Sequence, residues 1–373
     1  MAKLVALSIN SSWNIVNFRS GLVRRLQAEG FEVAAISPPD DWSGRLVAMG
    51  VKHLPIAIDN AGTSPLRDLR LLRDYRRALQ ALRPAAYLGW TIKPNIWGSL
   101  AAHGLGIPVI NNVSGLGTAF IRRGPLAAIV STLYRTAFGR SATVFFQNDE
   151  DRQLFVAKRL VALGKTALLP GSGIDLSRFV PKPDDRRPDG PFAFLLVARL
   201  LRDKGVVEYA QAAAMLRKAG TDARFRLLGF LDVANRTAIS RAEVDGWVAT
   251  GAIDYLGHAD DVRPAMRDAD CIVLPSYREG MPRTLLEGAA LAKPLIATDV
   301  PGCREIARSG VNALTCNVAD AHSLAEAMRA MLDLPATERA ALGQAGRRLA
   351  EQEFDQRIVA DRYVAALRRA TGG

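Results

Sequence analysis

Short apolar runs alternate with amphipathic stretches along almost the whole of this 373-residue chain. In the first half the apolar runs lie at residues 4–9, 31–36, 51–56, 86–90, 108–112, 143–147 and 166–169. Helical patterns fill the gaps between them, and this order is typical of a parallel sheet that helices cover on both faces. The first half is therefore predicted to be a doubly wound α/β domain.

The alternation stops and then starts again. The segment VPKPDDRRPDGP, residues 180–191, concentrates proline, charge and glycine, as a linker does. Six further strand-like runs follow, at residues 192–197, 224–228, 253–256, 271–274, 295–297 and 313–315. We predict a first domain over 1–180, a linker over 181–191, a second domain over 192–352, and a closing helix over 353–373 that packs back on the first domain. Ligands of such open sheets bind beyond the carboxyl ends of the strands, so a cleft between two facing sheets is expected.

Charge and composition limit the partners, metal sites and cellular locations that are expected of this chain. The formal net charge of +12 favours anionic partners such as phosphates, nucleic acid or acidic lipid. The three cysteines and four histidines show no metal-ligand spacing, so a protein-held metal is not expected. No apolar run approaches the roughly 18 residues of a membrane span, and the first residues do not resemble a signal peptide. A cytoplasmic location is expected.

The segment SYREGMPRTLLEGAALA, residues 276–292, follows a predicted buried strand. Pro282 suits the first turn of a helix, which places Glu279 just before that helix and Glu287 inside it. The amide groups of the first turn and the helix dipole would favour a phosphate, and the two carboxylates could accept hydrogen bonds from hydroxyl groups. The alternative is that Glu279 caps the helix and Glu287 is solvated.

A second cluster of polar residues follows the strand at 192–197. In VARLLRDKG, Arg199 and Lys204 are suited to bind a diphosphate, and Gly205 permits close approach of the backbone. The alternative is two exposed cations with Asp203 as a surface partner. After the first strand, the segment INSSWNIVNFRSG lacks the G-x-G-x-x-G pattern of a dinucleotide fold, which counts against an NAD enzyme.

Taken together, these segments resemble the retaining glycosyltransferases of family 4, which have the GT-B fold of two facing Rossmann-like domains. EGMPRTLLE, residues 279–287, is similar to the E-x7-E motif of that family, and Arg199 and Lys204 occupy its diphosphate-binding positions. The resemblance implies that Glu279 faces the donor sugar, that Glu287 binds the ribose, and that further residues line the donor site. Those further residues are Gly280, Met281, Arg283, Thr284, Gly229 and His258.

Three segments of the first half are similar to the subgroup that builds bacterial surface glycans on polyprenyl-diphosphate acceptors: TIKPNIWGSLAA, INNVSGLGTAFI and FFQNDEDRQLF. Many members carry an acceptor-domain histidine, where this chain has Thr91 and Lys93 instead. The acceptor-side candidates are Asn17, Lys93, Ser114 and Gly115. His103 is predicted to lie near a helix end, where it stabilises the helix dipole.

The resemblance implies transfer of a hexose or N-acetylhexosamine from a UDP-sugar to a polyprenyl-diphosphate-linked glycan, with retention and with no metal or cofactor. The expected partners are the nucleotide-sugar donor, the lipid-linked glycan acceptor and the anionic inner face of the cell membrane, on which the chain would be peripheral. The alternatives are a UDP-sugar epimerase of GT-B fold and a non-catalytic basic module that binds polyanions. No nucleic-acid recognition motif is apparent.

Two basic amphipathic stretches could lie on anionic lipid. Residues 64–83 carry Arg67, Arg70, Arg73, Arg76 and Arg77 beside a leucine stripe of Leu66, Leu69, Leu72, Leu79 and Leu82. Residues 119–140 combine Arg122, Arg123, Arg135 and Arg140 with apolar residues. Cations can surround an apolar face at a membrane in this way. The alternative for each helix is a core stripe with a solvated opposite face.

Overall fold

The computed structural model describes residues 3–59, 62, 64–115, 125–181, 190–231, 235 and 237–372. The chain forms two compact units, one made of Met1–Gly173 with Gln356–Gly373 and the other of Ile174–Asp355. The units divide between 173 and 174 and between 355 and 356, compared with predicted boundaries at 180, 192 and 352. Most of the predicted linker, residues 182–189, lies outside the described residues.

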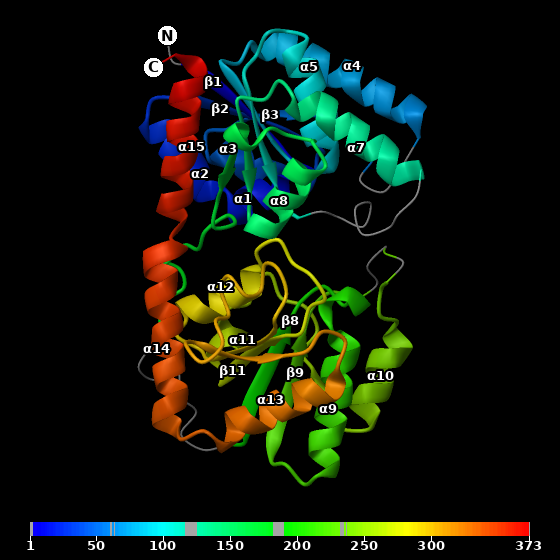
Figure 1. The fold of residues 1–373 in the computed structure, drawn as a ribbon, viewed down its shortest axis with the longest axis vertical. Coiled ribbons are helices and arrows are strands. Elements are labelled where there is room, and N and C mark those ends of the chain that lie inside the picture. The colour runs from blue at the N-terminus through cyan, green and yellow to red at the C-terminus, as the bar shows by residue number, and fades with distance from the viewer. Residues whose placement is uncertain are drawn as a thin grey trace. The chain divides into compact units, whose positions relative to one another are not determined.

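The first unit is built on a parallel sheet of seven strands in the order β3-β2-β1-β4-β5-β6-β7 (Figure 1). The strands are β1 Leu4–Ser8, β2 Glu32–Ser37, β3 Lys52–Pro55, β4 Ala86–Trp90, β5 Val109–Val113, β6 Thr143–Phe146 and β7 Thr166–Leu168. Each end lies within one residue of its predicted position. β4 and β5 are buried throughout, as expected of central parallel strands that are covered on both faces.

Helices cover this sheet. They are α1 Ser12–Phe18, α2 Ser20–Ala28, α3 Ser43–Ala48, α4 Pro65–Leu82, η1 Pro94–Gly98, α5 Ser99–His103, α7 Pro125–Phe138, α8 Asp149–Ala157, η2 Leu163–Lys165 and α15 Gln356–Thr371. The C-terminal α15 lies alongside α2, as Figure 1 shows. Its Tyr363 packs against Trp90 of β4 and Phe145 of β6, with ring centroids 5.5 and 5.0 Å apart. The last helix is therefore part of the core of the first unit.

The predicted helix over 95–102 differs in detail from the observed one. It begins as a π-helical turn, η1, and continues as the short α5. The Tyr87 hydroxyl donates to the Pro94 carbonyl at 2.9 Å, where this turn begins. Gly98 makes room for the tyrosine, because a Cβ there would lie 1.8 Å from the Tyr87 hydroxyl oxygen.

The leucine stripe predicted for residues 64–83 is partly wrong. The buried side chains of α4 are Leu71, Tyr75, Leu79 and Leu82. Leu66 and Leu69 are instead 71% and 58% exposed. The reason is geometric: a helix turns 100° per residue, and the two leucines lie on the side opposite Tyr75. Of the second basic stretch, residues 119–124 lie outside the described residues, and α7 begins at Pro125.

The second unit holds a parallel sheet of six strands in the order β10-β9-β8-β11-β12-β13. The strands are β8 Phe192–Val197, β9 Ala223–Leu228, β10 Asp254–Tyr255, β11 Cys271–Leu274, β12 Leu295–Thr298 and β13 Ala313–Cys316, again within one residue of prediction. The helices are η3 Arg202–Lys204, α9 Val206–Lys218, α10 Arg241–Ala249, α11 Arg263–Arg267, α12 Arg283–Ala290, α13 Ala321–Asp333 and α14 Ala336–Glu353. Two doubly wound parallel sheets in tandem confirm the predicted fold class.

Candidate functional site

The predicted donor-side residues of the second unit all follow carboxyl ends of strands. Arg199 and Lys204 come after β8, Gly229 after β9, His258 after β10 and Glu279 after β11. These strands are neighbours in the order β10-β9-β8-β11 and run parallel, so their carboxyl ends lie at one edge of the sheet. That edge is where open α/β sheets bind ligands.

Lys204 and Glu279 lie in contact at this edge. The lysine Nζ forms an ion pair with Glu279 Oε1, and the Ser276 hydroxyl donates to the same oxygen at 2.8 Å. The two charged side chains are 20% and 12% exposed, so the pair is largely shielded from water. The alternative pairing of Lys204 with Asp203 is therefore not observed. A cation and a carboxylate that are 75 residues apart in the sequence thus form one polar cluster.

Helix α12 begins at Arg283, with Pro282 as its N-cap residue and no side-chain cap hydrogen bond. Pro282, predicted in the first turn, instead directly precedes that turn. The alternative in which Glu279 caps this helix is wrong, because its carboxylate contacts Lys204 and Ser276. The start of α12 therefore has no acidic group in its first turn and presents the positive end of its dipole at the sheet edge.

Two glycines allow the backbone to close around Glu279. Gly205 has φ +70°, and a Cβ there would lie 2.1 Å from the Pro275 carbonyl oxygen. Gly302 has φ +86°, and its Cβ would lie 2.5 Å from the Glu279 carbonyl oxygen. A side chain at either position would push the Glu279 loop away from its neighbours.

A tyrosine joins the Glu279 loop to the Lys204 turn. The Tyr277 amide donates to the Asp203 carbonyl at 2.9 Å, and the Tyr277 hydroxyl donates to Glu208 Oε1 at 2.7 Å. Burial and the neighbouring Glu208 carboxylate raise the pKa of Tyr277 to about 12. Glu208 lies in the first turn of α9, where the helix dipole favours a carboxylate. The sequence carries no signal for this contact, because its partners are 69 residues apart and lie in different elements.

Glu287 is buried inside α12, with 8% of its surface exposed. Its Oε1 accepts hydrogen bonds from Arg283 Nη2 at 3.0 Å and from Arg283 Nε at 3.2 Å. Burial raises the pKa of Glu287, and the Arg283 guanidinium partly opposes the shift. The alternative of a solvated Glu287 is therefore wrong. Thr284 is turned to the sheet, because its hydroxyl donates to the Val197 carbonyl at 2.8 Å.

The remaining residues of the motif differ in exposure. Arg199 is exposed, and its guanidinium makes no hydrogen bond or ion pair within the described part of the chain. Gly280 is buried and Met281 is half-buried, immediately after Glu279. Arg199 therefore remains accessible to an anion, whereas Lys204 already has a carboxylate partner.

The loops that hold Gly229 and His258 are hydrogen-bonded together. The Gly229 amide donates to the Gly257 carbonyl at 2.8 Å, and the Tyr255 hydroxyl donates to the Gly229 carbonyl at 2.9 Å. Phe230 stacks on His258 with centroids 4.8 Å apart and an interplanar angle of 27°. Phe230 is 48% exposed, so an aromatic face is available at this corner of the sheet edge. Phe230 lies between Gly229 and Leu231, in a loop that the resemblance places near the donor nucleotide.

The acceptor-side candidates follow three neighbouring strands of the first unit. Asn17 lies in α1, after β1, and its amide group donates to the Trp13 carbonyl at 3.0 Å. Lys93, after β4, forms an ion pair with Asp68 of α4 at 2.6 Å. The Ser114 hydroxyl, after β5, donates to Asn112 Oδ1 at 2.9 Å. The structure brings these residues to the same sheet edge but shows no hydrogen bond or ion pair among the three.

Two other positions complete this edge of the first unit. Gly115 follows Ser114 with φ +142°, whereas Gly117 of the same loop lies outside the described residues. Thr91 has φ +62°, which is unusual for a β-branched residue, and its buried hydroxyl has no hydrogen-bond partner. Backbone strain of this kind is concentrated at functional sites.

His103 contacts backbone rather than another candidate residue. It ends α5, its Nε2 lies 2.8 Å from the Ala137 carbonyl oxygen, and burial lowers its pKa. Within the described ranges, no three His, Cys, Asp or Glu side chains are grouped as metal ligands. The helices that the structure describes also include none long and apolar enough to cross a membrane.

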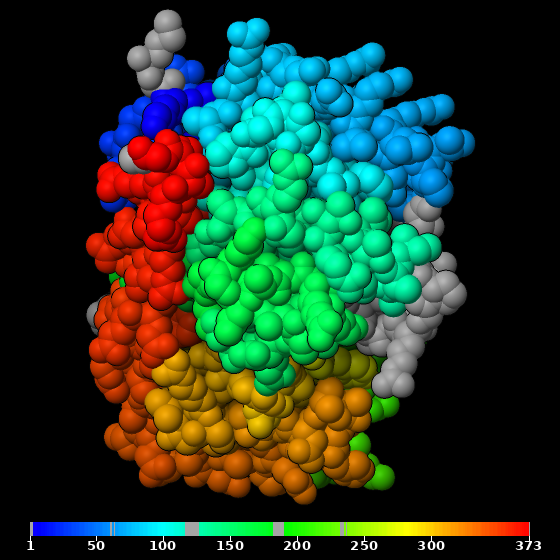
Figure 2. All heavy atoms as spheres, turned by 45° about the horizontal axis from the view of Figure 1, so that its top comes forward, coloured from blue at the N-terminus to red at the C-terminus, as the bar shows by residue number. Residues whose placement is uncertain are grey.

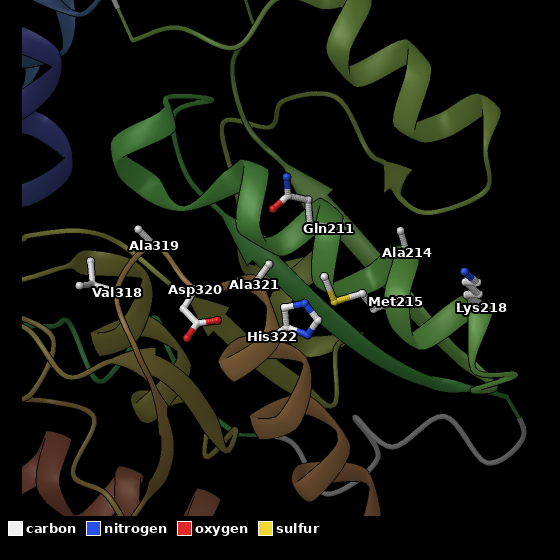
Figure 3. Close-up of a pocket in the computed structure, with 9 residues that line it drawn as sticks. All are labelled: Gln211, Ala214, Met215, Lys218, Val318, Ala319, Asp320, Ala321 and His322. Atoms are coloured by element: carbon white, nitrogen blue, oxygen red, sulfur yellow. The ribbon is translucent and has the colours of Figure 1, made fainter.

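A surface pocket lies elsewhere in the second unit, between α9 and the turn before α13 (Figure 3). Met215 and His322 line it, and Asp320 lines it while capping α13 through a hydrogen bond from the Ser323 amide at 2.9 Å. None of the predicted site residues contributes to this pocket.

Two family models match the chain. The first, described as a glycosyl transferase 4-like domain, matches residues 16–171, and the second, described as glycosyl transferases group 1, matches residues 191–333. Each match covers the sheet of one unit almost completely.

Two bacterial glycosyltransferases are similar in sequence to this chain. The chain is 28% identical over 371 residues to the Campylobacter jejuni N,N'-diacetylbacillosaminyl-diphospho-undecaprenol alpha-1,3-N-acetylgalactosaminyltransferase, and the match covers 94% of each chain. It is 24% identical to the Escherichia coli UDP-Gal:alpha-D-GlcNAc-diphosphoundecaprenol alpha-1,3-galactosyltransferase, over 65% of this chain and 64% of the relative.

Solved structures share the fold at low sequence identity. Anabaena HepE, solved in complex with UDP and glucose, matches with a TM-score of 0.80 and 16% identity, over 98% of this chain and 99% of that one. A glycosyltransferase from Rickettsia africae matches with a TM-score of 0.79 and 14% identity, over 99% and 98% of the two chains. With its two doubly wound sheets and its E-x7-E loop, the chain belongs to the group 1 glycosyl transferases with a glycosyl transferase 4-like N-terminal domain, and it is a glycosyltransferase of GT-B fold.

Proposed function

We propose that this glycosyltransferase moves a hexose or N-acetylhexosamine from a UDP-sugar to a polyprenyl-diphosphate-linked glycan in the biosynthesis of bacterial polysaccharide or glycan. The names of both relatives describe transfer to a diphospho-undecaprenol-linked sugar. The solved Anabaena protein holds UDP and glucose. These likenesses support the donor and acceptor classes.

The observation that carries the proposal is the ion pair between Lys204 and Glu279 at the carboxyl edge of the second sheet. A diphosphate that binds there would compete for the lysine ammonium, because it carries more negative charge than one carboxylate. Glu279 would then be able to accept hydrogen bonds from hydroxyl groups of the donor sugar. Donor binding would thus replace the Lys204–Glu279 ion pair by an ion pair between Lys204 and the diphosphate, while the Glu279 carboxylate would be satisfied by hydrogen bonds from Ser276 and the sugar hydroxyls.

Transfer breaks the bond between the anomeric carbon and the oxygen of the β-phosphate. The electron pair goes to the departing UDP, whose diphosphate would be stabilised by Lys204, by the exposed Arg199 and by the uncapped start of α12. The acceptor hydroxyl oxygen forms the new bond to the anomeric carbon. We propose that the diphosphate takes the hydroxyl proton on the same face, which gives retention and needs no metal ion or other cofactor.

The rest of the donor would lie along the same edge. We assign the ribose hydroxyls to Glu287, whose carboxylate already accepts hydrogen bonds from Arg283. The base would lie against the loops of Gly229 and His258, and the sugar and phosphates against Gly280 and Met281, with Arg283 and Thr284 adjoining. The acceptor would bind the first unit near Asn17, Lys93, Ser114 and Gly115. Because that acceptor is lipid-linked, we propose a cytoplasmic protein that is peripheral on the inner face of the membrane.

The test is release of UDP and formation of product from UDP-sugars and a short-chain prenyl-diphosphate-linked N-acetylhexosamine in detergent. Lys204→Ala and Glu279→Ala should each lower kcat by roughly 100-fold or more, the typical cost of one preorganised transition-state contact. Lys218→Ala, which removes an exposed lysine from the same unit, serves as the matched control and should retain activity.

The reaction products distinguish the proposal from the alternatives. UDP release that depends on acceptor supports transfer, and analysis of the product anomer tests retention. Conversion of the UDP-sugar to its epimer without acceptor would overturn the proposal. So would full activity of the Lys204→Ala variant.

A further inference from the structure

Helix α4 presents an apolar pair to solvent. Its inner face, Leu71, Tyr75, Leu79 and Leu82, is buried against the first sheet, whereas Leu66 and Leu69 on the opposite side are 71% and 58% exposed. These two leucines do not contribute to the core of the unit, because α4 packs on the sheet through its opposite, buried face.

Arginines surround the two leucines. Arg70, Arg73, Arg76 and Arg77 are exposed, and none of them forms an ion pair within the described part of the chain. We refer to these four residues with Leu66 and Leu69 as the outward face of α4. In Figure 2 the side chains of this light-blue segment project away from the body of the unit.

The carboxylates of α4 do not neutralise its outward face. Asp68 points to the other side of the helix, where it forms a largely buried ion pair with Lys93. Asp74 is half-buried. Arg67 lies beyond the edge of this face and pairs with Asp59 at 2.9 Å. The outward face therefore combines four exposed arginines that form no ion pair within the described residues with exposed apolar surface.

We propose that the outward face of α4 docks on anionic phospholipid, with the arginines at the headgroups and Leu66 and Leu69 at the boundary with the acyl chains. This inference rests on the proposed function, since a lipid-linked acceptor requires the enzyme at a membrane. The charge complements an anionic leaflet, and the leucines lose contact with water only if the surface also offers an apolar layer. A nucleic acid or another soluble polyanion would satisfy the arginines but leave the leucines exposed.

The second basic helix does not show the same combination in its described part. In α7, Tyr134 and Phe138 are buried, and Ile129 is 58% exposed. The Arg135 guanidinium donates hydrogen bonds to the carbonyls of Arg159 and Lys158, at 3.1 and 3.3 Å. Exposed arginines without an ion pair beside exposed leucines are therefore a feature of α4 and not of the described part of α7.

The experiment is co-sedimentation of the full chain with vesicles of phosphatidylglycerol and phosphatidylcholine, and with vesicles of phosphatidylcholine alone. An arginine near an anionic surface contributes about 1 kcal/mol, so Arg73→Gln with Arg77→Gln should weaken binding about 30-fold. Leu66→Gln with Leu69→Gln should weaken it roughly tenfold or more, from the apolar area removed. The wild type should bind neutral vesicles weakly.

Matched controls remove the same groups from other surfaces. Arg348→Gln with Arg369→Gln removes two exposed arginines, and Leu163→Gln with Val248→Gln removes two exposed apolar side chains, 54% and 45% exposed in the wild type. Both control variants should bind anionic vesicles within about twofold of the wild type. All these sites are on the surface, so the variants are expected to fold, which thermal unfolding checks.

The outcomes separate this inference from the proposed function. Vesicle binding that survives both α4 variants would overturn the docking surface, and binding that the arginine variant alone weakens would indicate a general polyanion surface instead. UDP binding, measured by calorimetry on the same variants, should stay unchanged. Variants that lose vesicle binding but keep UDP binding would support the docking surface on α4. A wild-type protein that binds vesicles through α4 but binds no UDP or UDP-sugar would overturn the proposed function without contradicting the docking surface.

Discussion

Replacing Tyr277 by phenylalanine removes one hydroxyl and tests whether the Glu279 loop must be held to the Lys204 turn. The wild-type hydroxyl donates to the Glu208 carboxylate at 2.7 Å in a partly buried setting. Hydrogen bonds to charged groups contribute about 1.5–3 kcal/mol, and partial exposure lowers the expected loss to about 1–2 kcal/mol. For a unit of this size the melting temperature should fall by about 2–8 °C.

The kinetic effect should exceed what lost stability alone produces. Without the hydroxyl, the loop keeps the backbone bond from the Tyr277 amide to Asp203 but loses its second attachment to α9. We expect kcat/KM for the UDP-sugar to fall about tenfold or more at a temperature where the variant is fully folded, because small displacements of positioned groups are costly in catalysis. Thermal unfolding, UDP calorimetry and steady-state kinetics measure the two effects separately.

Two further variants separate positioning from stability. Glu208→Gln keeps an oxygen that can accept from the Tyr277 hydroxyl and should retain most activity, whereas Glu208→Ala should behave like Tyr277→Phe. Tyr209→Phe is the matched control, because that hydroxyl bonds to the Phe194 and Arg226 carbonyls in the core at 3.2 and 3.1 Å. The reasoning fails if Tyr277→Phe and Tyr209→Phe lose similar stability and both retain wild-type kcat/KM.

Three other outcomes are expected. Burial raises the pKa of Glu287, so the folded state keeps this proton to a higher pH than the unfolded chain does. The stability that this carboxyl contributes is therefore fully present below about pH 4.5, the ordinary pKa of a glutamate. It is lost as the pH rises through the raised pKa of the folded state. Urea unfolding across this range should show the free energy of unfolding of the wild type falling relative to that of Glu287→Gln, which has no titratable proton at this position, and a constant difference would contradict the shift. Gly229→Ala should destabilise the second unit by about 1–3 kcal/mol in the same assay, because the new Cβ would lie 1.8 Å from the Ala198 carbonyl oxygen; an unchanged midpoint would show that the loop relaxes freely. Gly246→Ala, in α10 with no atom within 4 Å of the new Cβ, should instead stabilise by about 0.5–1 kcal/mol, and any loss of stability would refute the assigned helical conformation.

The local pattern of apolar residues was sufficient to predict where the strands lie. Strand positions follow from local apolar runs, and the parallel arrangement follows from their alternation with helices. Each of the thirteen strands in the described part of the chain therefore lies within one residue of prediction. The helix over 94–103 could not be predicted in the same detail. Its π-helical turn lies against Tyr87 of the preceding strand, whose hydroxyl donates to the Pro94 carbonyl, and no local pattern in the sequence indicates this contact.

The sequence by itself determined the two doubly wound sheets, the loops that follow their strands, and the residue types of the E-x7-E segment. Those properties depend on local pattern and spacing. Only the tertiary structure decided that Lys204 pairs with Glu279, that Tyr277 contacts Glu208, and that Leu66 lies in water, because each depends on how separate elements pack together. Contacts between residues far apart in the chain depend on the order of the strands in the sheet and on the rotation of each helix about its axis. Neither property is determined by a short stretch of sequence.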